Sequence, residues 1–278
     1  MYSKFQLARK YARYLLTASN GKGHGIHSPF VYDFVKNVLN DKQDYAAYTR
    51  VETLRRQLLK DPAILEIEDL GAGSAAGGSS AAQDSGPASR IMHRRSVAEL
   101  ARHAAKPPRL GQLLFRIARY YQSGIILELG TSLGLSTAYF ALAREQAKVL
   151  TIEGAGAIAA VAEKNFRSLD LRNVEWTVGN FDDVLADALD RGGSPDLVFV
   201  DGNHRLEPTL YYFDWLIHRS SPSSILIFDD IHWSGEMEEA WKTIREDPRV
   251  MLTIDLFFIG IVVQRENFKI KQDFTIRF

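Results

Sequence analysis

The 278 residues include 34 lysines and arginines against 34 aspartates and glutamates, so the formal net charge is zero and no nucleic-acid partner is expected. The chain has no cysteine, which excludes disulfides and thiolate metal sites. No stretch approaches the roughly 20 apolar residues of a membrane span, and the N-terminus does not begin a signal peptide. We therefore expect a cytoplasmic protein without membrane contact, with enough apolar residues for a sizeable core.

Residues 1–108 predict a helical N-terminal extension. Apolar residues recur at helical spacing over 5–16, and further helices are expected over 30–39 and 45–59. The first helix is basic and amphipathic, and packing on its own protein is preferred over a membrane surface. His24 and His27 lie in a glycine loop that either is solvated or covers the active site.

The second half of this extension is less regular. Residues 64–68 alternate as a short strand, and a helix is expected over 96–105. Between them, residues 71–89 are rich in glycine, alanine and serine and predict a flexible loop. This loop contains Gly71-Ala72-Gly73-Ser74-Ala75-Ala76, which matches a dinucleotide fingerprint but lacks the following helix and acidic strand end. Pro107-Pro108 marks the boundary of the next domain.

Residues 109–278 predict a Rossmann-like, doubly wound α/β domain. Short apolar strands alternate with helices, which indicates a mostly parallel sheet covered on both faces. A tight connection joins the last two strands, so they form an antiparallel C-terminal hairpin at one edge. Trp176, Trp215 and Trp241 lie in regular elements and are expected in the core. The expected strands are 125–129, 148–152, 174–178, 197–200, 225–228, 251–256 and 259–264, and the helices 110–121, 135–144, 157–169, 181–189, 208–218 and 235–246.

A glycine loop follows the first strand of this domain, at residues 128–137. Gly130 lets the chain turn sharply, and Gly134 is expected to let the backbone approach a ligand. Ser132 stands where a pyrophosphate loop has its second glycine, which argues against NAD or FAD. Glu153 ends the next strand and can accept both hydroxyls of a ribose. Residues 179–182 follow the third strand, where an adenine edge would lie.

Three acidic residues end the fourth and fifth strands: Asp201, Asp229 and Asp230. The carboxyl ends of parallel strands line the ligand crevice, so these carboxylates should converge and repel unless a positive charge lies among them. A divalent metal such as Mg²⁺, Ca²⁺ or Mn²⁺ is the economical answer. The alternatives are a strand-end cap for Asp201 and a cap for the helix near Ser234 for the other two.

Residues 128–137 resemble motif I of class I S-adenosylmethionine-dependent methyltransferases. Gly111-Gln112-Leu113-Leu114 resembles a segment of the small cation-dependent O-methyltransferases of the catechol and caffeoyl-CoA type, and the resemblance covers about 110–264. It implies a seven-stranded sheet and S-adenosylmethionine as cofactor. The cofactor-binding residues expected on this basis are Glu128, Gly130, Thr131, Ser132, Gly134, Ser136, Glu153, Gly154, Asn180, Phe181, Asp182 and Asp201.

The resemblance also implies a mechanism. Cation-dependent enzymes carry an Asp and then an Asp-Asn pair at the interval that separates Asp201 from Asp229, but Asp230 stands where Asn is usual. His204 stands where those enzymes carry a lysine, and histidine can act as a base near neutral pH. The expectation is in-line methyl transfer to a hydroxyl of a small molecule, with a metal at Asp201, Asp229 and Asp230, and with His204 and Asp201 as catalytic residues.

Other functions remain open at this stage. An NAD-dependent or nucleotide-sugar enzyme, a polyamine synthase and a non-catalytic nucleotide-binding protein could all use a similar sheet. The residues leave the identity of the acceptor open. Related enzymes are often dimers, and an exposed edge hairpin could serve as a homodimer contact.

Overall fold

The structure is a computed structural model, and it describes residues 1–19, 21–68, 92–265 and 268–278. The predicted flexible loop at 71–89, and the glycine fingerprint within it, lie outside these residues. Among the helices of the described ranges, none is long and apolar enough to cross a membrane.

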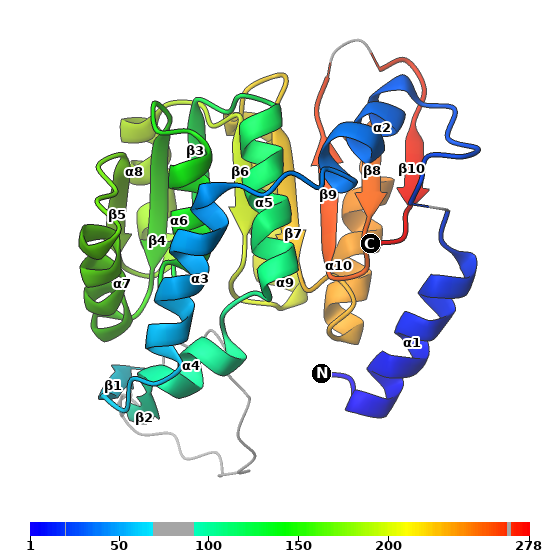
Figure 1. Cartoon of the computed structure of the whole chain (residues 1–278). Helices are drawn as coiled ribbons and strands as arrows, with labels where there is room; N and C mark the ends of the chain where they lie inside the picture. The colour runs from blue at the N-terminus through cyan, green and yellow to red at the C-terminus, as the bar shows by residue number, and fades with distance from the viewer. Residues whose placement is uncertain (20, 69–91, 266–267) are drawn as a thin grey trace, which may run out of the picture.

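The centre of the fold is one large sheet (Figure 1). Its strands in chain order are β3 (Ile125–Leu129), β4 (Lys148–Glu153), β5 (Val174–Val178), β6 (Leu197–Val200), β7 (Ile225–Asp229), β8 (Leu252–Asp255), β9 (Ile259–Val263) and β10 (Gln272–Thr275). Their spatial order is β10-β8-β9-β7-β6-β3-β4-β5. Only β9 runs antiparallel to its neighbours. The mostly parallel sheet and the antiparallel hairpin are thus confirmed. An eighth strand, β10, pairs with β8 and covers the edge that was expected to be exposed.

Helices cover both faces of the sheet, as the near-continuous apolar strands predict. One face packs on α5 (Pro108–Tyr120), α6 (Leu135–Ala143) and α7 (Gly156–Ser168). The other face packs on α8 (Phe181–Gly192), α9 (Leu206–Arg219) and α10 (Gly235–Glu246). Strand β3 contributes to both cores, with Ile126 on the first face and Leu127 on the second.

The N-terminal segments pack on the same sheet domain. They are α1 (Lys4–Thr17), α2 (Pro29–Phe34), the π-helix η1 (Val35–Leu39), α3 (Ala46–Leu58), β1 (Ile64–Glu68), β2 (Met92–Ser96) and α4 (Val97–His103). Buried residues of α2, η1, α3 and α4 join the core on the first face. Helix α1 instead packs through Tyr11 and Tyr14 on Phe257, which follows β8. The extension therefore shares the hydrophobic core of the sheet domain.

Three local expectations need correction. The helix over 30–39 begins as α2 but continues as a π-helical turn, η1. Residues 92–96, where no strand was expected, pair as β2 with β1. Trp176 is 38% exposed at the sheet surface, whereas Trp241 is buried as predicted. The sequence pattern shows which side chains share one face of a strand or helix. Which of these faces is buried depends on the segments that pack on it.

Candidate active site at the carboxyl edge of the sheet

The carboxyl ends of β3 and β6 touch directly. The backbone N–H of Asp201 donates to the carbonyl of Leu129 at 2.8 Å. Gly130 follows with a φ of +102°, and a β-carbon there would lie 2.0 Å from the carbonyl oxygen of Asp201. Only glycine tolerates both this conformation and this contact. The predicted sharp turn at Gly130 is therefore present, and it brings the glycine loop against the first acidic strand end.

Gly134 has a packing role in addition to the expected one. It is the N-cap of α6, with a φ of +78°. A β-carbon on Gly134 would lie 2.4 Å from the ring of Phe166 on α7. The absent side chain therefore makes room for a neighbouring helix of the protein. The approach of a ligand to the backbone of Gly134 stays a prediction.

Glu128 is fully buried at the end of β3. Its Oε2 accepts hydrogen bonds from the hydroxyls of Thr137 and Thr151, the latter at 2.7 Å. Its Oε1 has no hydrogen-bond partner among the described residues. Burial raises the pKa of Glu128 to about 7, against the opposing hydrogen bonds. A buried carboxylate with one unpaired oxygen suits a cationic ligand, because the positive charge of the ligand compensates for the hydration that the carboxylate lost on burial.

Glu153, at the end of β4, faces the same loop. Its two carboxylate oxygens accept from the backbone N–H groups of Ser132 at 2.8 Å and Ala155 at 3.0 Å. Ser132 adopts a left-handed φ of +48°, which aims its N–H at this carboxylate. Burial raises the pKa of Glu153, and the charge of Asp201 acts in the same direction. Glu128, Glu153 and Asp201 thus form a group of mutually repelling carboxylates.

Of the remaining cofactor-binding candidates near the glycine loop, one is buried and supports the loop, and two are partly exposed. Thr131 is buried, and its hydroxyl lies 2.6 Å from that of Thr151, so it braces the Glu128 network. Ser136 and Gly154 are half-buried at the start of α6 and just after β4. These two positions leave polar groups accessible at the sheet edge.

Asn180, Phe181 and Asp182 lie at the N-terminus of α8. The Asn180 side chain caps the helix. The ring of Phe181 packs edge-on against Tyr212 of α9, and the Tyr212 hydroxyl donates to Asp182 at 2.9 Å. No sequence pattern marks Tyr212, because one aromatic residue on an amphipathic helix normally belongs to the core. In the fold it ties the loops after β5 and β6 together, since Asn203 also donates to its hydroxyl at 3.1 Å.

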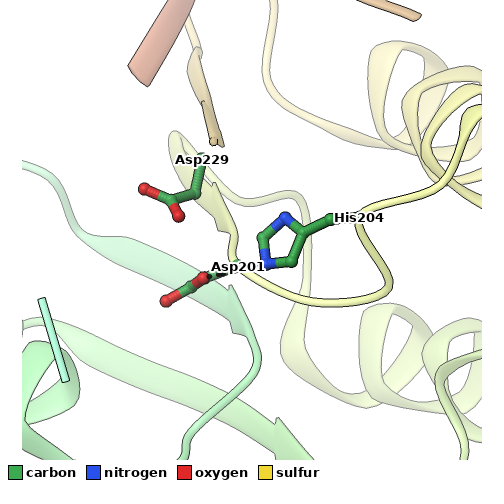
Figure 2. A group of neighbouring side chains, drawn as sticks. All are labelled: Asp201, His204 and Asp229. Carbon is green, nitrogen blue, oxygen red and sulfur yellow. Dashed lines mark ion pairs between the residues drawn. The ribbon is translucent and has the colours of Figure 1, made fainter. Parts of the chain in front are cut away.

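The acidic strand ends converge as predicted. Figure 2 shows Asp201 and His204 beside one another, with Asp229 facing them from the neighbouring strand. The His204 Nε2 lies 3.6 Å from Oδ1 of Asp201. One potential ligand atom from each of Asp201, His204 and Asp229 falls within 4.8 Å of the others. The helix-cap interpretation of Asp229 and Asp230 is wrong, because Ser234 caps α10 with its own side chain.

The positive charge among these carboxylates is Lys106, which the sequence reasoning missed. Its ammonium lies 2.9 Å from Oδ1 of Asp201, contacts Oδ2 of Asp229 directly, and lies 3.9 Å from Asp230. Burial alone would lower the pKa of Lys106, but the three carboxylates raise it well above its usual range. Burial raises the pKa of Asp229, the Asp230 charge adds to this, and Lys106 opposes it. Lys106 stands directly before Pro107-Pro108, and no motif or periodicity around it indicates that it belongs to a functional site.

A divalent cation does not fit the site as these residues lie. The donor atoms are of the right chemical type and are close enough to one another. However, the ammonium of Lys106 contacts an oxygen of both Asp201 and Asp229. The position that the sequence assigned to a metal is therefore taken by a cation of the chain itself.

His232 lies outside this group, although it follows the same strand as Asp229. Its two ring nitrogens lie 3.1 Å from Glu238 and 2.9 Å from Asp255. Glu238 also pairs with Lys10 and accepts from Tyr2. His232 thus joins α10 and β8 to the N-terminal helix. His24 and His27 are exposed.

Comparisons with known proteins agree with this fold. Residues 127–231 match a family model described as "Methyltransferase domain". A catechol O-methyltransferase from Niastella koreensis is 32% identical over 133 residues, which make up 47% of this chain. The aligned part spans 59% of that curated relative.

Solved structures share the architecture. The O-methyltransferase TomG from Streptomyces achromogenes, in complex with S-adenosylmethionine, is 23% identical over 58% of this chain and 82% of its own, with a TM-score of 0.52. The methyltransferase PaMTH1 from Podospora anserina, bound to S-adenosylhomocysteine, is 13% identical over 96% and 98%, with a TM-score of 0.56. An O-methyltransferase from Bacillus cereus is 19% identical over 84% of this chain and 97% of its own, with a TM-score of 0.52. At these identities the likeness shows a common fold.

Residues 127–231 thus resemble a methyltransferase domain, and the chain shares the fold of the solved methyltransferases. The similar curated sequence and two of these solved structures are O-methyltransferases by name.

Proposed function

We propose that this protein transfers a methyl group from S-adenosylmethionine to a hydroxyl of a small molecule. The observation that carries the proposal is the group of carboxylates around Gly130. Glu128, Glu153 and Asp201 end three adjacent strands, and the buried Oε1 of Glu128 has no partner among the described residues. S-adenosylmethionine carries a sulfonium and an ammonium, so it brings positive charge close to Glu128 and Glu153, whose burial disfavours the ionised form.

The cofactor-binding residues belong to this proposal. Glu153 would accept the ribose hydroxyls, and the α8 N-terminus at Asn180, Phe181 and Asp182 would border the adenine. The backbone turn at Gly130, Thr131 and Ser132 would lie along the cofactor. Glu128 would act through its buried charge, with Ser136, Gly154 and Asp201 completing the set. Gly134 would support the conformation of the loop, because the space that a side chain would need at this position is filled by Phe166.

The chemistry proposed is an in-line displacement. When bound, S-adenosylmethionine would supply an electrophilic methyl group. The acceptor oxygen forms a bond to the methyl carbon as the carbon–sulfur bond breaks, and the bonding pair goes to sulfur. The imidazole of His204 takes the proton of the acceptor hydroxyl, a role typically worth about 10²–10⁴-fold in rate. The Nε2 of that imidazole lies 3.6 Å from Oδ1 of Asp201. The protein aligns the reacting atoms and excludes water.

The division of the chain is part of the proposal. Residues 109–278 would bind the cofactor, and residues 1–108 would shape the acceptor side. Lys106 supports this division, because it reaches the acidic strand ends from the first segment. The curated relative is named for catechol, which makes a phenol the first acceptor to try. A cytoplasmic location is consistent with the absence of cysteine, and a homodimer would need a contact other than the hairpin edge that β10 covers.

Isothermal titration separates this proposal from its rivals. We expect S-adenosylmethionine and S-adenosylhomocysteine to bind one per chain and NAD not to bind. Transfer of radiolabelled methyl from the cofactor to catechol and to a panel of phenols then tests catalysis. Binding of NAD in place of the two adenosyl compounds would favour a dehydrogenase or nucleotide-sugar enzyme. Binding of the adenosyl compounds without transfer to any acceptor would favour a non-catalytic protein.

A further inference from the structure

We propose that the ammonium of Lys106 is the resident cation of this site and does the work that a divalent metal does in the cation-dependent enzymes. The proposal has two parts. The first is that Lys106 excludes a divalent cation from Asp201, Asp229 and Asp230, and it stands on geometry alone. The second is that Lys106 faces the acceptor oxygen, and it rests on the proposed methyl transfer.

The contacts of Lys106 are those of a specific, largely buried ion-pair site. The side chain is 15% exposed, and its two close partners are 12% exposed at Asp201 and 1% at Asp229. Each of these carboxylates gives one oxygen to the ammonium, and Asp230 adds a third negative charge at 3.9 Å. Ion pairs on a protein surface are worth little, but a buried charge that loses its partner is costly. The lysine is therefore required by the acids it neutralises.

A divalent cation would compete with the lysine for the same oxygens. Mg²⁺ and Mn²⁺ need carboxylate oxygens at about 2.0–2.2 Å, and the ammonium already contacts Oδ1 of Asp201 and Oδ2 of Asp229. Two cations sharing these oxygens would repel one another strongly at such a short separation. A metal can enter only if the lysine leaves, which would move a buried charge out of a triple carboxylate site.

The site contains one carboxylate oxygen that accepts no hydrogen bond from the described residues. Oδ1 of Asp229 is buried and has no hydrogen-bond partner among the described residues. A hydroxyl that approaches this oxygen would also lie beside the Lys106 ammonium and His204. The ammonium would stabilise the oxygen anion that forms when His204 takes the proton. It carries one charge where a metal carries two, so it lowers the pKa of a hydroxyl less.

The weaker cation points to a class of acceptor. A phenol, with an ordinary pKa near 10 as for tyrosine, needs only modest help to ionise at neutral pH. An aliphatic alcohol needs far more. We therefore assign phenols to this site as acceptors, with methyl transfer that is independent of added metal.

The first test measures metal binding without cofactor or acceptor. Mn²⁺ is titrated into the full-length wild type and the Lys106→Ala and Lys106→Met variants, with electron paramagnetic resonance reporting the free ion. The wild type should bind no Mn²⁺ at this site at millimolar concentration, and both variants should gain one binding equivalent, at least tenfold tighter. Lys10→Ala is the matched control, because Lys10 pairs with Glu238 outside the site. It should behave like the wild type.

Two results would overturn the exclusion of metal. One is tight binding of one Mn²⁺ by the wild type that Asp229→Asn removes. The other is a folded Lys106→Met variant, checked by circular dichroism, that gains no metal. Lys106→Met nearly preserves the length of the side chain, so it covers the case in which Lys106→Ala does not fold.

The second test measures turnover of a phenol and of a matched benzylic alcohol, with and without EDTA. Wild-type turnover of the phenol should be unchanged by EDTA, and Lys106→Met should lose at least tenfold in kcat with cofactor affinity retained. Loss of turnover in EDTA, restored by Mg²⁺, would overturn the assignment, as would a preference for the alcohol. If neither acceptor is methylated, the proposed function fails and this second part with it, whereas the Mn²⁺ titration still decides the first part.

Discussion

The backbone of Gly130 lies against the carbonyl of Asp201, so close that a β-carbon on Gly130 would lie 2.0 Å from that oxygen. This contact sets the spacing between the glycine loop after β3 and the acidic end of β6. The two groups of residues proposed for cofactor and acceptor meet at this point.

Gly130→Ala should separate these two strand ends. The substitution combines a positive φ with a clash against backbone that cannot rotate away, and we expect a loss of more than about 2 kcal/mol in the free energy of unfolding. Binding of S-adenosylmethionine should fall at least tenfold. Gly25→Ala is the control, because Gly25 has a φ of +78° but open space around it. Urea unfolding and calorimetry measure both effects, and equal losses in the two variants would show that the contact with Asp201 is unimportant.

Glu128 should make the protein less stable as the pH rises. Its pKa in the folded protein is about 7, against an ordinary value of 4.5, so the folded state binds the proton more tightly than the unfolded state. Stability from this group is therefore present at low pH and is lost between about pH 4.5 and 7, on the order of 3 kcal/mol in total. Glu128→Gln should remove that dependence, because the amide oxygen still accepts from Thr137 and Thr151.

The measurement for Glu128 is the free energy of unfolding of both proteins at pH 5 and pH 8 without cofactor. The variant should equal the wild type or fall below it at pH 5 and gain relative to it at pH 8. Affinity for S-adenosylmethionine at pH 8 should fall in the variant, since the charge is gone. A constant difference between the two proteins across this range would contradict the raised pKa.

His204→Ala should retain cofactor binding and lose most turnover. The imidazole lies beside Asp201 at 3.6 Å, and removing a general base typically costs about 10²–10⁴-fold in kcat. His218→Ala on the exposed face of α9 provides the control, since its side chain is 64% exposed. The assay is methyl transfer to a phenol under saturating cofactor. Unchanged kcat in the His204 variant would remove this residue from the mechanism.

His232 should stabilise the docking of the N-terminal helix at low pH. Its pKa is raised: burial opposes the shift, but the hydrogen bonds and charges of Asp255 and Glu238 outweigh it. The groups around it are Asp255, Glu238, Tyr2, Lys10 and Trp241. A histidine with a raised pKa adds stability that is complete below its ordinary value of 6.5 and disappears as the pH rises through the folded value.

Comparison of the wild type with His232→Gln tests this directly. The difference in free energy of unfolding should be larger at pH 5.5 than at pH 9. Lys10→Met should reduce α1 docking at both values, because the lysine stays charged throughout. Limited proteolysis within residues 1–19 reports the docking itself. A pH-independent effect of His232→Gln would assign this residue a packing role against Phe257 only.

Much of the fold follows from patterns that are local in the chain. The buried strands β3, β4, β6 and β7 are short apolar runs, and each is followed by a glycine or an acid that ends it. Strand β10 was missed, because its four residues alternate between exposed and half-buried and become a strand only beside β8. Trp176 was misplaced for a related reason: it lies on β5 at the end of the sheet order, and Phe166 of α7 covers its ring only in part.

The sequence by itself determined which residues lie at the carboxyl ends of the strands, because strand spacing and glycine turns are encoded within a few positions. It therefore placed Glu128, Glu153, Asp201 and Asp229 at one edge and required a positive charge among the last of these. Only the tertiary structure decided that this charge is Lys106, that Gly134 accommodates Phe166, and that His232 turns toward α1. These outcomes depend on segments far apart in the chain, whose contacts are fixed by packing and burial and leave no local pattern.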